Sequence, residues 1–410
     1  MLLTIALLSL APLAPVQGEA HRPLPERGDP TLRAHAVDQM MRSFVREHRV
    51  PGASLAIMKE GELIYARGFG WADPETELPV RPESLFRIAS ISKPMTAVAV
   101  LQLVEQKKLK LEENPFEVIG LGEALKKEGR DPRLAEITVE QLLHHRAGWD
   151  RGLSFDAMFV PDRVRKHLGS EGPPSQRQII RFMLDQPLDH DPGSQYAYSN
   201  FGYCLLGRVI EARSGLSYEQ YMQRKVLTPL GVTGMRMGRS LPDQAWTDEV
   251  RYVDGKGRTA FAAVDAGRRV SICYAHDQEV MDAHGGWIAT AADLARFAAA
   301  FADGEKPELL QAATVARMWA PAPGAQPPVW YGMGWSVRDV GEGRRNAWHS
   351  GLLTGGTSTL LVRRHDGYTW AALFNTDRSR SNGKILAGQI DPLIHRAVNR
   401  VPRWNPEDER

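Results

Sequence analysis

The sequence predicts an α/β (α+β) fold: an antiparallel sheet built from both ends of the chain, flanked by helices and interrupted by a mostly helical subdomain. Two observations lead to this fold class. Strand-like alternation of apolar and polar residues occurs near both ends of the chain, whereas helical periodicity dominates the middle. Helical patterns also lie beside the strand-like runs, so helices are available to cover the sheet.

Residues 1–18 (MLLTIALLSLAPLAPVQG) have the character of an export signal. They contain no charged side chain, and their apolar part is shorter than the about 20 residues that span a bilayer. Val16 and Gly18 suit cleavage near Gly18, so we expect a signal peptide, a periplasmic or secreted protein and no stable membrane span after cleavage. An uncleaved anchor is the alternative, because no positive charge precedes the apolar run.

Residues 19–31 are polar and rich in proline, so we expect a linker there. A folded domain over 32–400 and a tail over 401–410 follow it. The domain begins with a predicted helix over 32–49, whose apolar residues recur at helical spacing: Leu32, Ala36, Met40 and Phe44.

The next segments complete the first half of the α/β part, expected over 32–108. The run GASLAIMKEGELIYARGFG predicts two strands around a turn at Lys59-Glu60-Gly61. The pattern from Ser90 to Lys108 predicts a helix, and its lysine-rich last turn suits the negative end of the helix dipole.

The middle of the domain, about 109–280, is the expected helical insertion. Its helical patterns are ITVEQLLHH, FGYCLLGRVIEARSG and SYEQYMQRKVLTPLG. Two long stretches that contain Gly and Pro, 151–175 and 236–280, separate them and are read as loops.

The α/β part resumes over 281–400. The run ATAADLARFAAAFADG predicts a helix with Thr290 as its cap. Strands follow in YGMGWSVRDV, RRNAWHSG and GTSTLLVRRHDGYTWAALFNTD, the last with a turn at His365-Asp366-Gly367. A closing helix is expected over 383–399.

Composition limits the classes of partner and cofactor. The 51 basic and 49 acidic residues give a net charge of +2, and no run of Lys or Arg stands out. Nucleic acid is therefore not an expected partner. The two cysteines, Cys204 and Cys273, are expected to be free thiols, with a disulfide as the alternative in an exported protein. No group of residues has metal-ligand spacing. We expect neither a metal nor another cofactor.

The first element that carries chemistry is Ser90-Ile91-Ser92-Lys93, which opens a helix. Positions three apart share a helix face, so Ser90 and Lys93 can touch. A serine hydroxyl needs a base, and a lysine serves as one when burial or nearby cations lower its pKa. For the tetrapeptide by itself, a helix cap followed by a solvated lysine is the favoured interpretation.

The second element is Tyr198-Ser199-Asn200, where a Gly/Pro loop meets a helix. Near the Ser–Lys pair, Tyr198 can relay protons to a leaving group. The Asn200 amide can bind a substrate carbonyl or hold Lys93. Taken singly, each residue also fits a structural role, as a buried aromatic or a helix cap.

The third element is His349-Ser350-Gly351, on an expected strand. A strand edge beside the nucleophile can bind an extended substrate through main-chain hydrogen bonds, and glycine permits a close approach to the backbone. Just beyond it, the Leu352 amide can pair with the Ser90 amide as an oxyanion hole. A lone histidine is otherwise read as a structural residue.

Taken together, the three elements resemble the motifs of the penicillin-recognising serine hydrolases. This beta-lactamase-related family includes class C beta-lactamases, D-aminopeptidases, D-Ala-D-Ala carboxypeptidases and family VIII esterases. It carries S-x-x-K, then Y-x-N, then K-T-G or H-x-G, in the order found here. Flanking runs such as LFRIASISKPMTAVAVLQLVE and YSNFGYCLLGRVIE are also similar, and the resemblance covers about 35–395. It implies a beta-lactamase/transpeptidase-like fold.

The resemblance also implies a reaction. A small ester, an amide or a D-amino-acid peptide acylates Ser90, Lys93 and Tyr198 share acid–base duty, and water releases the acyl group. Asn200 and His349 position the substrate and tune the proton network. His349 stands where classical beta-lactamases have a lysine, and an imidazole is charged only in part near neutral pH. A specialised beta-lactamase is therefore disfavoured.

Other activities stay open. Within the class, the alternatives are a D-Ala-D-Ala carboxypeptidase and a weak beta-lactamase. From another class, the alternative is a non-catalytic sensor of peptides or peptidoglycan with the same fold. Such a sensor is expected to have lost part of the catalytic set, which here is complete.

Several further residues have expected roles. His145 is read as structural, holding the loop that follows it, and Ser92 as a polar neighbour of the Ser–Lys pair. Trp287, after the paired glycines of HGGW, is expected in the core. Trp149 and Phe155 either line the pocket or belong to a surface loop.

Overall fold

The computed structural model describes residues 24–29, 34–301, 309–401 and 404. The expected signal peptide over 1–18 lies outside these residues, as does most of the expected tail. Within the expected linker the structure differs from the prediction, because Glu26–Arg27 forms a short strand, β1, against Gly68 and Phe69. A charged side chain holds β1 in place: Arg42 Nε donates to Glu26 at 2.6 Å.

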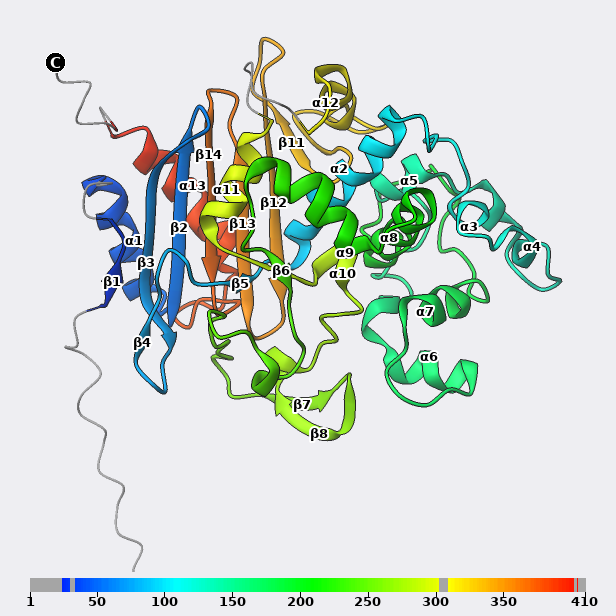
Figure 1. Ribbon diagram of the computed structural model, residues 1–410, viewed down its shortest axis with the longest axis horizontal. Coiled ribbons are helices and arrows are strands. Elements are labelled where there is room, and N and C mark those ends of the chain that lie inside the picture. Colours follow the sequence, from blue (N-terminus) through cyan, green and yellow to red (C-terminus); the bar gives the residue numbers. More distant parts are fainter. Residues whose placement is uncertain (1–23, 30–33, 302–308, 402–403, 405–410) are drawn as a thin grey trace, which may run out of the picture.

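A nine-stranded antiparallel sheet runs through the described part of the α/β region (Figure 1). Its order is β1-β3-β2-β14-β13-β12-β11-β10, with β4 paired to β3. Strands from the two ends of the chain meet where β2 lies beside β14, with Ala56 opposite Ala371. The prediction of an antiparallel sheet built from both ends is confirmed. The bounds are β2 Gly52–Lys59, β3 Glu62–Asp73, β4 Leu78–Pro79, β10 Val329–Tyr331, β11 Ser336–Asp339, β12 Arg345–Leu353, β13 Thr357–Arg363 and β14 Tyr368–Phe374.

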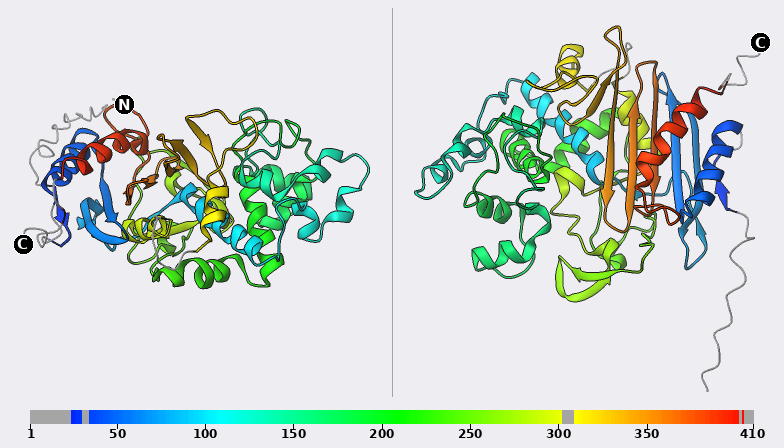
Figure 2. Two further views of the ribbon diagram at one scale, coloured as in Figure 1. Left: turned by 90° about the horizontal axis from the view of Figure 1, so that it is seen from above. Right: turned by 180° about the vertical axis from the view of Figure 1, so that it is seen from behind.

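Helices cover both faces of this sheet (Figure 2). Side chains of β2 alternate between the faces: Leu55 and Ile57 pack with α1 and α13, whereas Ala56 and Met58 belong to the core on the other face. There α11 packs against β2 and β14, and α2 packs against α8 of the helical region. Thr290 caps α11 by accepting from Asp293 N, as predicted. The bounds are α1 His35–Glu47, α2 Ser92–Glu105, α11 Ala291–Ala299 and α13 Leu386–Val398.

The helical insertion forms the other side of the molecule (Figure 1). It contains every helix predicted for it, and α6 lies within the stretch 151–175 that was predicted to be a loop. Its bounds are α3 Pro115–Val118, α4 Gly122–Leu125, α5 Val139–Leu143, α6 Pro161–Leu168, α7 Gln176–Met183, α8 Asn200–Ser214 and α9 Tyr218–Tyr221, which continues as a π-helical turn over Met222–Leu227.

Two small sheets lie between these regions. β5 (Phe86–Arg87) and β6 (Arg236–Met237) pair with β9 (Trp287–Ala289), and this sheet leads directly into the segment that carries Ser90. A hairpin of β7 (Thr259–Ala262) and β8 (Asp265–Ser271) occupies part of the expected loop 236–280. The remaining helices are α10 Asp282–Gly285 and α12 Ala312–Met318.

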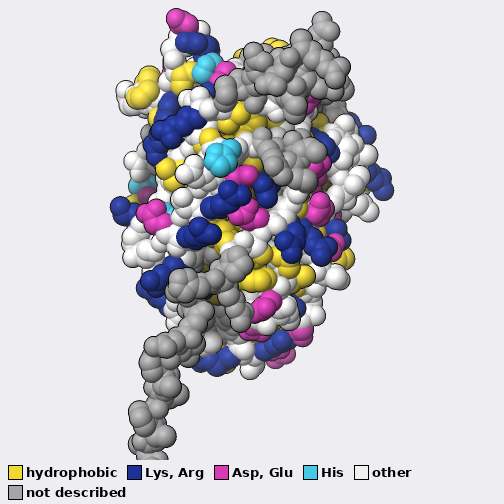
Figure 3. Space-filling model, turned by 90° about the vertical axis from the view of Figure 1, so that its left-hand side faces the viewer, with side chains coloured by type: hydrophobic (Ala, Val, Ile, Leu, Met, Phe, Trp, Pro, Cys, Tyr) yellow, Lys and Arg dark blue, Asp and Glu magenta, His cyan; other side chains and the backbone are white. Residues whose placement is uncertain are grey.

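The core and surface agree with the compositional predictions. Cys204 and Cys273 are both buried free thiols, and Trp287 lies fully in the core. On the side beyond α1, basic and acidic side chains lie intermingled (Figure 3). Within the described residues, none of the helices combines the length and the apolar character needed to cross a bilayer.

Candidate active site

Ser90 lies in a 3₁₀ turn, Ala89–Ile91, which opens α2. Two hydrogen bonds to the backbone of Ile88 hold this turn, and its backbone is strained at Ala89. Ile88 N donates to Trp287 O at 3.0 Å, which continues the pairing of β5 with β9. Thr359 Oγ1 of β13 donates to Ile88 O at 3.0 Å. Ala89 has a φ of +49°, a strained conformation for a residue with a Cβ, of the kind that collects at functional sites.

Gly351 brings β12 against this turn. A Cβ on Gly351 would stand 2.2 Å from Ile88 O and 2.2 Å from Thr359 Oγ1, so no larger residue fits without movement. The glycine thus makes room for the protein's own Ile88–Ala89. The approach of substrate to Gly351, which the sequence led us to expect, stays a prediction. Beyond Trp348, which pairs with Ser336, β12 has β13 on one side and the pocket on the other.

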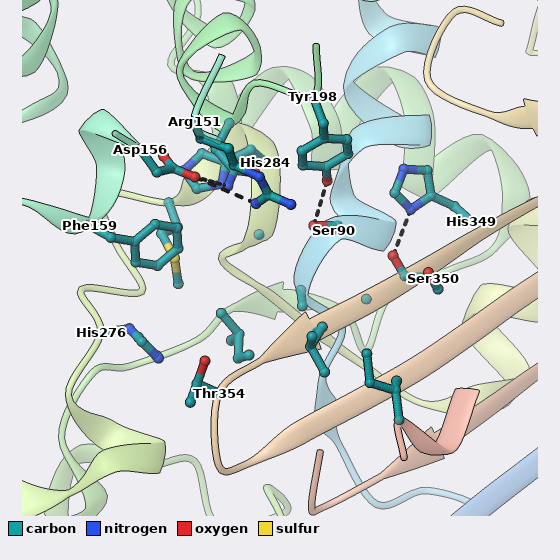
Figure 4. Close-up of a pocket in the computed structure, with 18 of the residues that line it drawn as sticks. Ser90, Arg151, Asp156, Phe159, Tyr198, His276, His284, His349, Ser350 and Thr354 are labelled. Carbon is teal, nitrogen blue, oxygen red and sulfur yellow. Dashed lines mark hydrogen bonds and ion pairs between the residues drawn. The ribbon is translucent and has the colours of Figure 1, made fainter. Parts of the chain in front are cut away.

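Ser90, Lys93 and Tyr198 meet at the serine hydroxyl, and Figure 4 shows the Tyr198 hydroxyl directed at Ser90. Lys93 Nζ is 3.0 Å from Ser90 Oγ, and the Tyr198 hydroxyl donates to Ser90 Oγ at 2.8 Å. Lysine and serine come from adjacent turns at the start of α2, and the tyrosine comes from the segment before α8. The structure thus brings together residues that are 108 positions apart in the sequence.

Lys93 is fully buried, and its amine is surrounded by neutral groups. Besides Ser90, Nζ reaches Asn200 Oδ1 at 2.8 Å and His284 O at 3.0 Å. No carboxylate of the described residues lies within ion-pair distance of it. Burial therefore holds the pKa of the Lys93 ammonium well below its ordinary value; the Asp156 charge opposes this shift and the Arg151 charge adds to it.

Burial also raises the pKa of Tyr198 above its ordinary value, so its hydroxyl stays protonated at neutral pH. His145 fixes this tyrosine in place. Ser199 N donates to His145 Nδ1 at 3.2 Å, Ala197 N donates to His145 O at 2.8 Å, and the imidazole packs on the Tyr198 ring with centroids 4.3 Å apart. His145 thus holds the segment around Tyr198, rather than only the loop that directly follows it.

Both ring nitrogens of His349 have partners within the protein. Nδ1 lies 2.8 Å from Ser350 O and Nε2 lies 3.1 Å from the Tyr331 hydroxyl. Because a carbonyl only accepts, Nδ1 carries the hydrogen and the Tyr331 hydroxyl donates to Nε2. Burial lowers the pKa of His349 to about 3. The imidazole is therefore neutral at physiological pH. The sequence had indicated a side chain that is charged in part, so His349 differs even more from the fixed positive charge of a lysine.

These residues open onto a cavity of about 680 Å³. Ser90, Tyr198, Asn200, His349, Ser350, Gly351 and Leu352 all line it, and Lys93 lies beneath Ser90. Leu352 exposes 38% of its surface at the opening. The other lining residues are Ala89, Arg151, Asp156, Phe159, Tyr196, His276, Met281, His284, Gly285, Tyr331, Ser336, Leu353, Thr354 and Ile385.

Three pocket residues that contact the predicted site residues were not identified from the sequence. Arg151 and Asp156 form an ion pair with a nitrogen–oxygen distance of 3.7 Å (Figure 4). Asp156 also accepts from Asn200 Nδ2 at 2.7 Å. Tyr331 holds His349. The first two lie in a stretch that has no regular pattern, so no sequence signal marked them.

Two other expectations are settled by packing. Trp149 is buried against Phe116 and Phe201, and Phe155 packs on Phe182, so neither lines the pocket. Ser92 Oγ donates to Ala89 O at 2.8 Å and so supports the strained turn.

Among the described residues, no group of three or more His, Cys, Asp or Glu side chains is placed to hold a metal ion.

The comparisons with known proteins agree with this geometry. The family model described as Beta-lactamase matches residues 37–391. A probable fimbrial assembly protein FimD, serogroup H1, of Dichelobacter nodosus is 33% identical over 196 residues, 47% of this chain and 46% of that protein. Esterase EstB of Burkholderia gladioli is 30% identical over 233 residues, 56% of this chain and 57% of the esterase. These matches span about half the length of each relative.

Among solved structures, EstCE1, described as a hydrolase with promiscuous acyltransferase activity, aligns with a TM-score of 0.69. The alignment covers 90% of this chain and 98% of that one at 22% identity. At this identity the likeness concerns the fold alone. The beta-lactamase/transpeptidase-like architecture expected from the sequence is therefore the observed one.

Proposed function

The chain belongs to the beta-lactamase family, and from that membership we propose that it is a serine hydrolase that forms an acyl-enzyme at Ser90. One observation carries the proposal. Lys93 Nζ lies 3.0 Å from Ser90 Oγ in a fully buried position that disfavours the ammonium form. A neutral amine at hydrogen-bond distance is what a serine hydroxyl needs to lose its proton.

The acylation step follows from the proton positions. Ser90 Oγ attacks the substrate carbonyl carbon, and its proton passes to Lys93 Nζ. The carbonyl oxygen becomes an oxyanion, which the backbone amides of Ser90 and Leu352 stabilise. The tetrahedral intermediate then collapses, and the leaving group receives the proton from Lys93 through the Tyr198 hydroxyl, which already donates to Ser90 Oγ at 2.8 Å.

Deacylation repeats the sequence with water as nucleophile. Lys93, again neutral, takes a proton from the water with Tyr198 as the relay, and Ser90 Oγ leaves the acyl group and regains its proton. Asn200 and His349 act on this network from its two sides, Asn200 by holding Lys93 and His349 by holding Tyr331 at the pocket wall.

We propose a small neutral ester or amide as the substrate, with D-amino-acid peptides as a further class. The electrostatics of the pocket support this choice. His349 is neutral, Lys93 is disfavoured as a cation, and Arg151 is paired with Asp156. Among the described lining residues, no unpaired cation is available to bind a substrate carboxylate. This absence of a fixed positive charge disfavours a specialised beta-lactamase. The similarity to esterase EstB supports an ester in particular.

A parallel rate panel tests the activity and separates the substrates: a short-chain p-nitrophenyl ester, a D-alanine anilide, a D-Ala-D-Ala peptide and a chromogenic cephalosporin. We expect turnover of the ester and slow or absent turnover of the cephalosporin. Ser90→Ala and Lys93→Ala are each expected to lower kcat/KM by about 10²–10⁴-fold or more, since both remove a group that takes part in the proton transfer. Cephalosporin turnover as fast as that of the ester would refute the argument from the neutral pocket.

The alternative is a binding protein that has the same fold but does not catalyse hydrolysis. A fluorophosphonate probe separates the two, because it reacts with an activated serine. We expect labelling of the wild-type protein and none of Ser90→Ala. An unlabelled, folded wild-type protein would favour the sensor.

We further propose that residues 1–18 direct export to the periplasm or medium and are then removed. Their uncharged, apolar sequence supports this. N-terminal sequencing of protein purified from the exported fraction is expected to start near residue 19. A start at Met1 in a membrane fraction would indicate an uncleaved anchor instead.

A further inference from the structure

We propose that Asp156 is a positioning residue that acts through the Asn200 amide to keep the lone pair of the Lys93 amine directed at the Ser90 hydroxyl. This inference rests on the proposed function, since it concerns how Lys93 serves as the base. Asp156 lies outside all three sequence motifs, in the stretch that precedes α6.

A neutral lysine amine has two N–H donors and one lone pair. Three oxygen atoms surround Lys93 Nζ at 2.8–3.0 Å. Two of them, Asn200 Oδ1 and His284 O, are carbonyl oxygens that only accept. They take both hydrogens, and the lone pair is left facing Ser90 Oγ, the one partner that also carries a hydrogen.

This arrangement requires the Asn200 amide to present its oxygen to Lys93. An amide can be turned over without any change of shape, and the opposite orientation would present an N–H donor. Asp156 selects between the two. Its Oδ2 accepts from Asn200 Nδ2 at 2.7 Å, and a carboxylate oxygen facing the amide oxygen would be repelled.

Two contacts, besides that with Asn200, hold Asp156 in place. Its Oδ1 accepts from Met158 N at 3.2 Å, as the cap of the turn Ala157–Phe159. Arg151 lies 3.7 Å from its Oδ2, and the Arg151 guanidinium also covers the outer face of the Tyr198 ring, 4.6 Å from the centroid. The side chain of Asp156 is only 14% exposed. The carboxylate is therefore rigidly placed at the wall of the pocket.

Without this carboxylate, the Asn200 amide is free to turn. Its Nδ2 then donates to the Lys93 lone pair, in direct competition with the Ser90 hydroxyl. The amine would stay neutral and buried and yet be unable to take the serine proton. The expected consequence is a loss of rate with little change in substrate binding.

The charge of Asp156 gives a second, independent readout in the pH profile. The groups that act on Lys93 come from several elements: Asp156 and Arg151 before α6, Tyr198 before α8, Tyr203 in α8, His284 in α10, His145 after α5 and His349 in β12. Asp156 is the carboxylate that raises the pKa of Lys93. Its removal lowers that pKa further and moves the acid limb of the rate profile to lower pH.

The test uses Asp156→Ser, because serine keeps an N-cap for Ala157–Phe159 but is too short to reach Asn200. We expect kcat for a p-nitrophenyl ester to fall tenfold or more with KM changed less than threefold, and the acid limb to move to lower pH. Arg151→Gln, which removes the opposing charge, is expected to move the limb to higher pH. A kcat within twofold of wild type for Asp156→Ser would overturn the proposal.

A double-mutant cycle with Asn200→Ala separates positioning from a general structural effect. If Asp156 acts through Asn200, then Asp156→Ser changes kcat and the rate of fluorophosphonate labelling less than twofold in the Asn200→Ala background. An equal loss in both backgrounds would show that Asp156 merely supports its loop. Absence of ester turnover and of labelling in the wild-type protein would instead refute the proposed function, so the two failures are distinguishable.

Discussion

At the scale of single residues, the chemistry of the site depends on how few charges surround Lys93. A buried ammonium without an anionic partner is costly, so the neutral amine is favoured. The same burial disfavours the ionised form of Tyr198. Burial therefore favours the neutral amine of Lys93 and the protonated hydroxyl of Tyr198, the forms in which the proposed mechanism uses them as base and acid, and both preferences result from desolvation.

This predicts a specific pH dependence for ester hydrolysis. Lys93 must be neutral, so kcat/KM is expected to fall tenfold per pH unit as the pH decreases below the depressed pKa of Lys93. Because the pKa of Tyr198 is raised, its hydroxyl persists, and no alkaline limb is expected below about pH 10, the ordinary pKa of tyrosine. A pH-rate profile with a short-chain p-nitrophenyl ester measures both limbs.

His349 provides the control for this prediction. A limb near pH 6–7 would ordinarily be assigned to a histidine, whose unperturbed pKa is about 6.5. The pKa of His349 is lowered to about 3, so His349→Gln is expected to leave the position of the acid limb unchanged, whatever its effect on the rate. Disappearance of the limb in this variant would assign the titration to His349 and exclude Lys93 as the titrating group.

At the scale of elements, the site depends on the contact between β12 and the turn before α2. The strand passes so close to Ile88–Ala89 that only Gly351 fits there, and the same contact sets the distance from the strand edge to Ser90. Ser92 Oγ and Thr359 Oγ1 fasten the turn from its two sides. Strand and helix are thus held as one unit around Ser90.

Gly351→Ala tests this contact. The added methyl group would overlap Ile88 O and Thr359 Oγ1, so we expect a loss of about 1–3 kcal/mol in the free energy of unfolding, measured by urea denaturation. Ester turnover is expected to fall as well, because the strand edge moves away from Ser90. Unchanged stability and turnover would show that the turn and strand are free to separate.

Gly388→Ala is the matched control. Gly388 lies inside α13, and an added Cβ would meet no atom within 4 Å. Alanine costs less backbone entropy than glycine in a helix, so the unfolding free energy is expected to rise by about 0.5–1 kcal/mol. Turnover should be unaffected, since α13 covers the face of the sheet remote from the helical region.

At the scale of the whole molecule, the two ends of the chain share one sheet. β2 and β14 pair over their full length, and α1 and α13 together cover one face. The pocket draws its residues from the helical insertion and from β12 at the same time. Loss of either end therefore disturbs the site as well as the sheet.

Ile390→Ala in α13 tests whether the pocket and the sheet lose their structure together. Ile390 is fully buried in the core between α13 and the sheet, so we expect a loss of about 2–5 kcal/mol in stability. On heating, activity and secondary structure are expected to disappear in one transition, at a lower temperature than in the wild type. Arg396→Ala, at an exposed position of the same helix, should stay within about 0.5 kcal/mol of wild type. Activity that outlasts the unfolding of the sheet would contradict the coupling.

Much of this could be predicted from sequence because the signals are local. Strand alternation, helix periodicity and the Thr290 cap depend on residues close in the chain, and so does the spacing of Ser90 and Lys93 on one helix face. The order of the three motifs then added the family, and with it the positions of Tyr198 and His349. The helix α6 and the hairpin β7–β8 escaped prediction because they lie within the long stretches 151–175 and 236–280, which were read as loops for their Gly and Pro content.

The sequence by itself determined the sheet that joins both ends, the Ser–Lys pair and the expectation of hydrolase chemistry, because these follow from periodicity and motif spacing. Only the tertiary structure decided the protonation of the site. The neutrality of His349 depends on burial and on Tyr331, and the orientation of Asn200 depends on Asp156. Desolvation and hydrogen-bond direction arise where distant segments meet, and no short stretch of sequence encodes them.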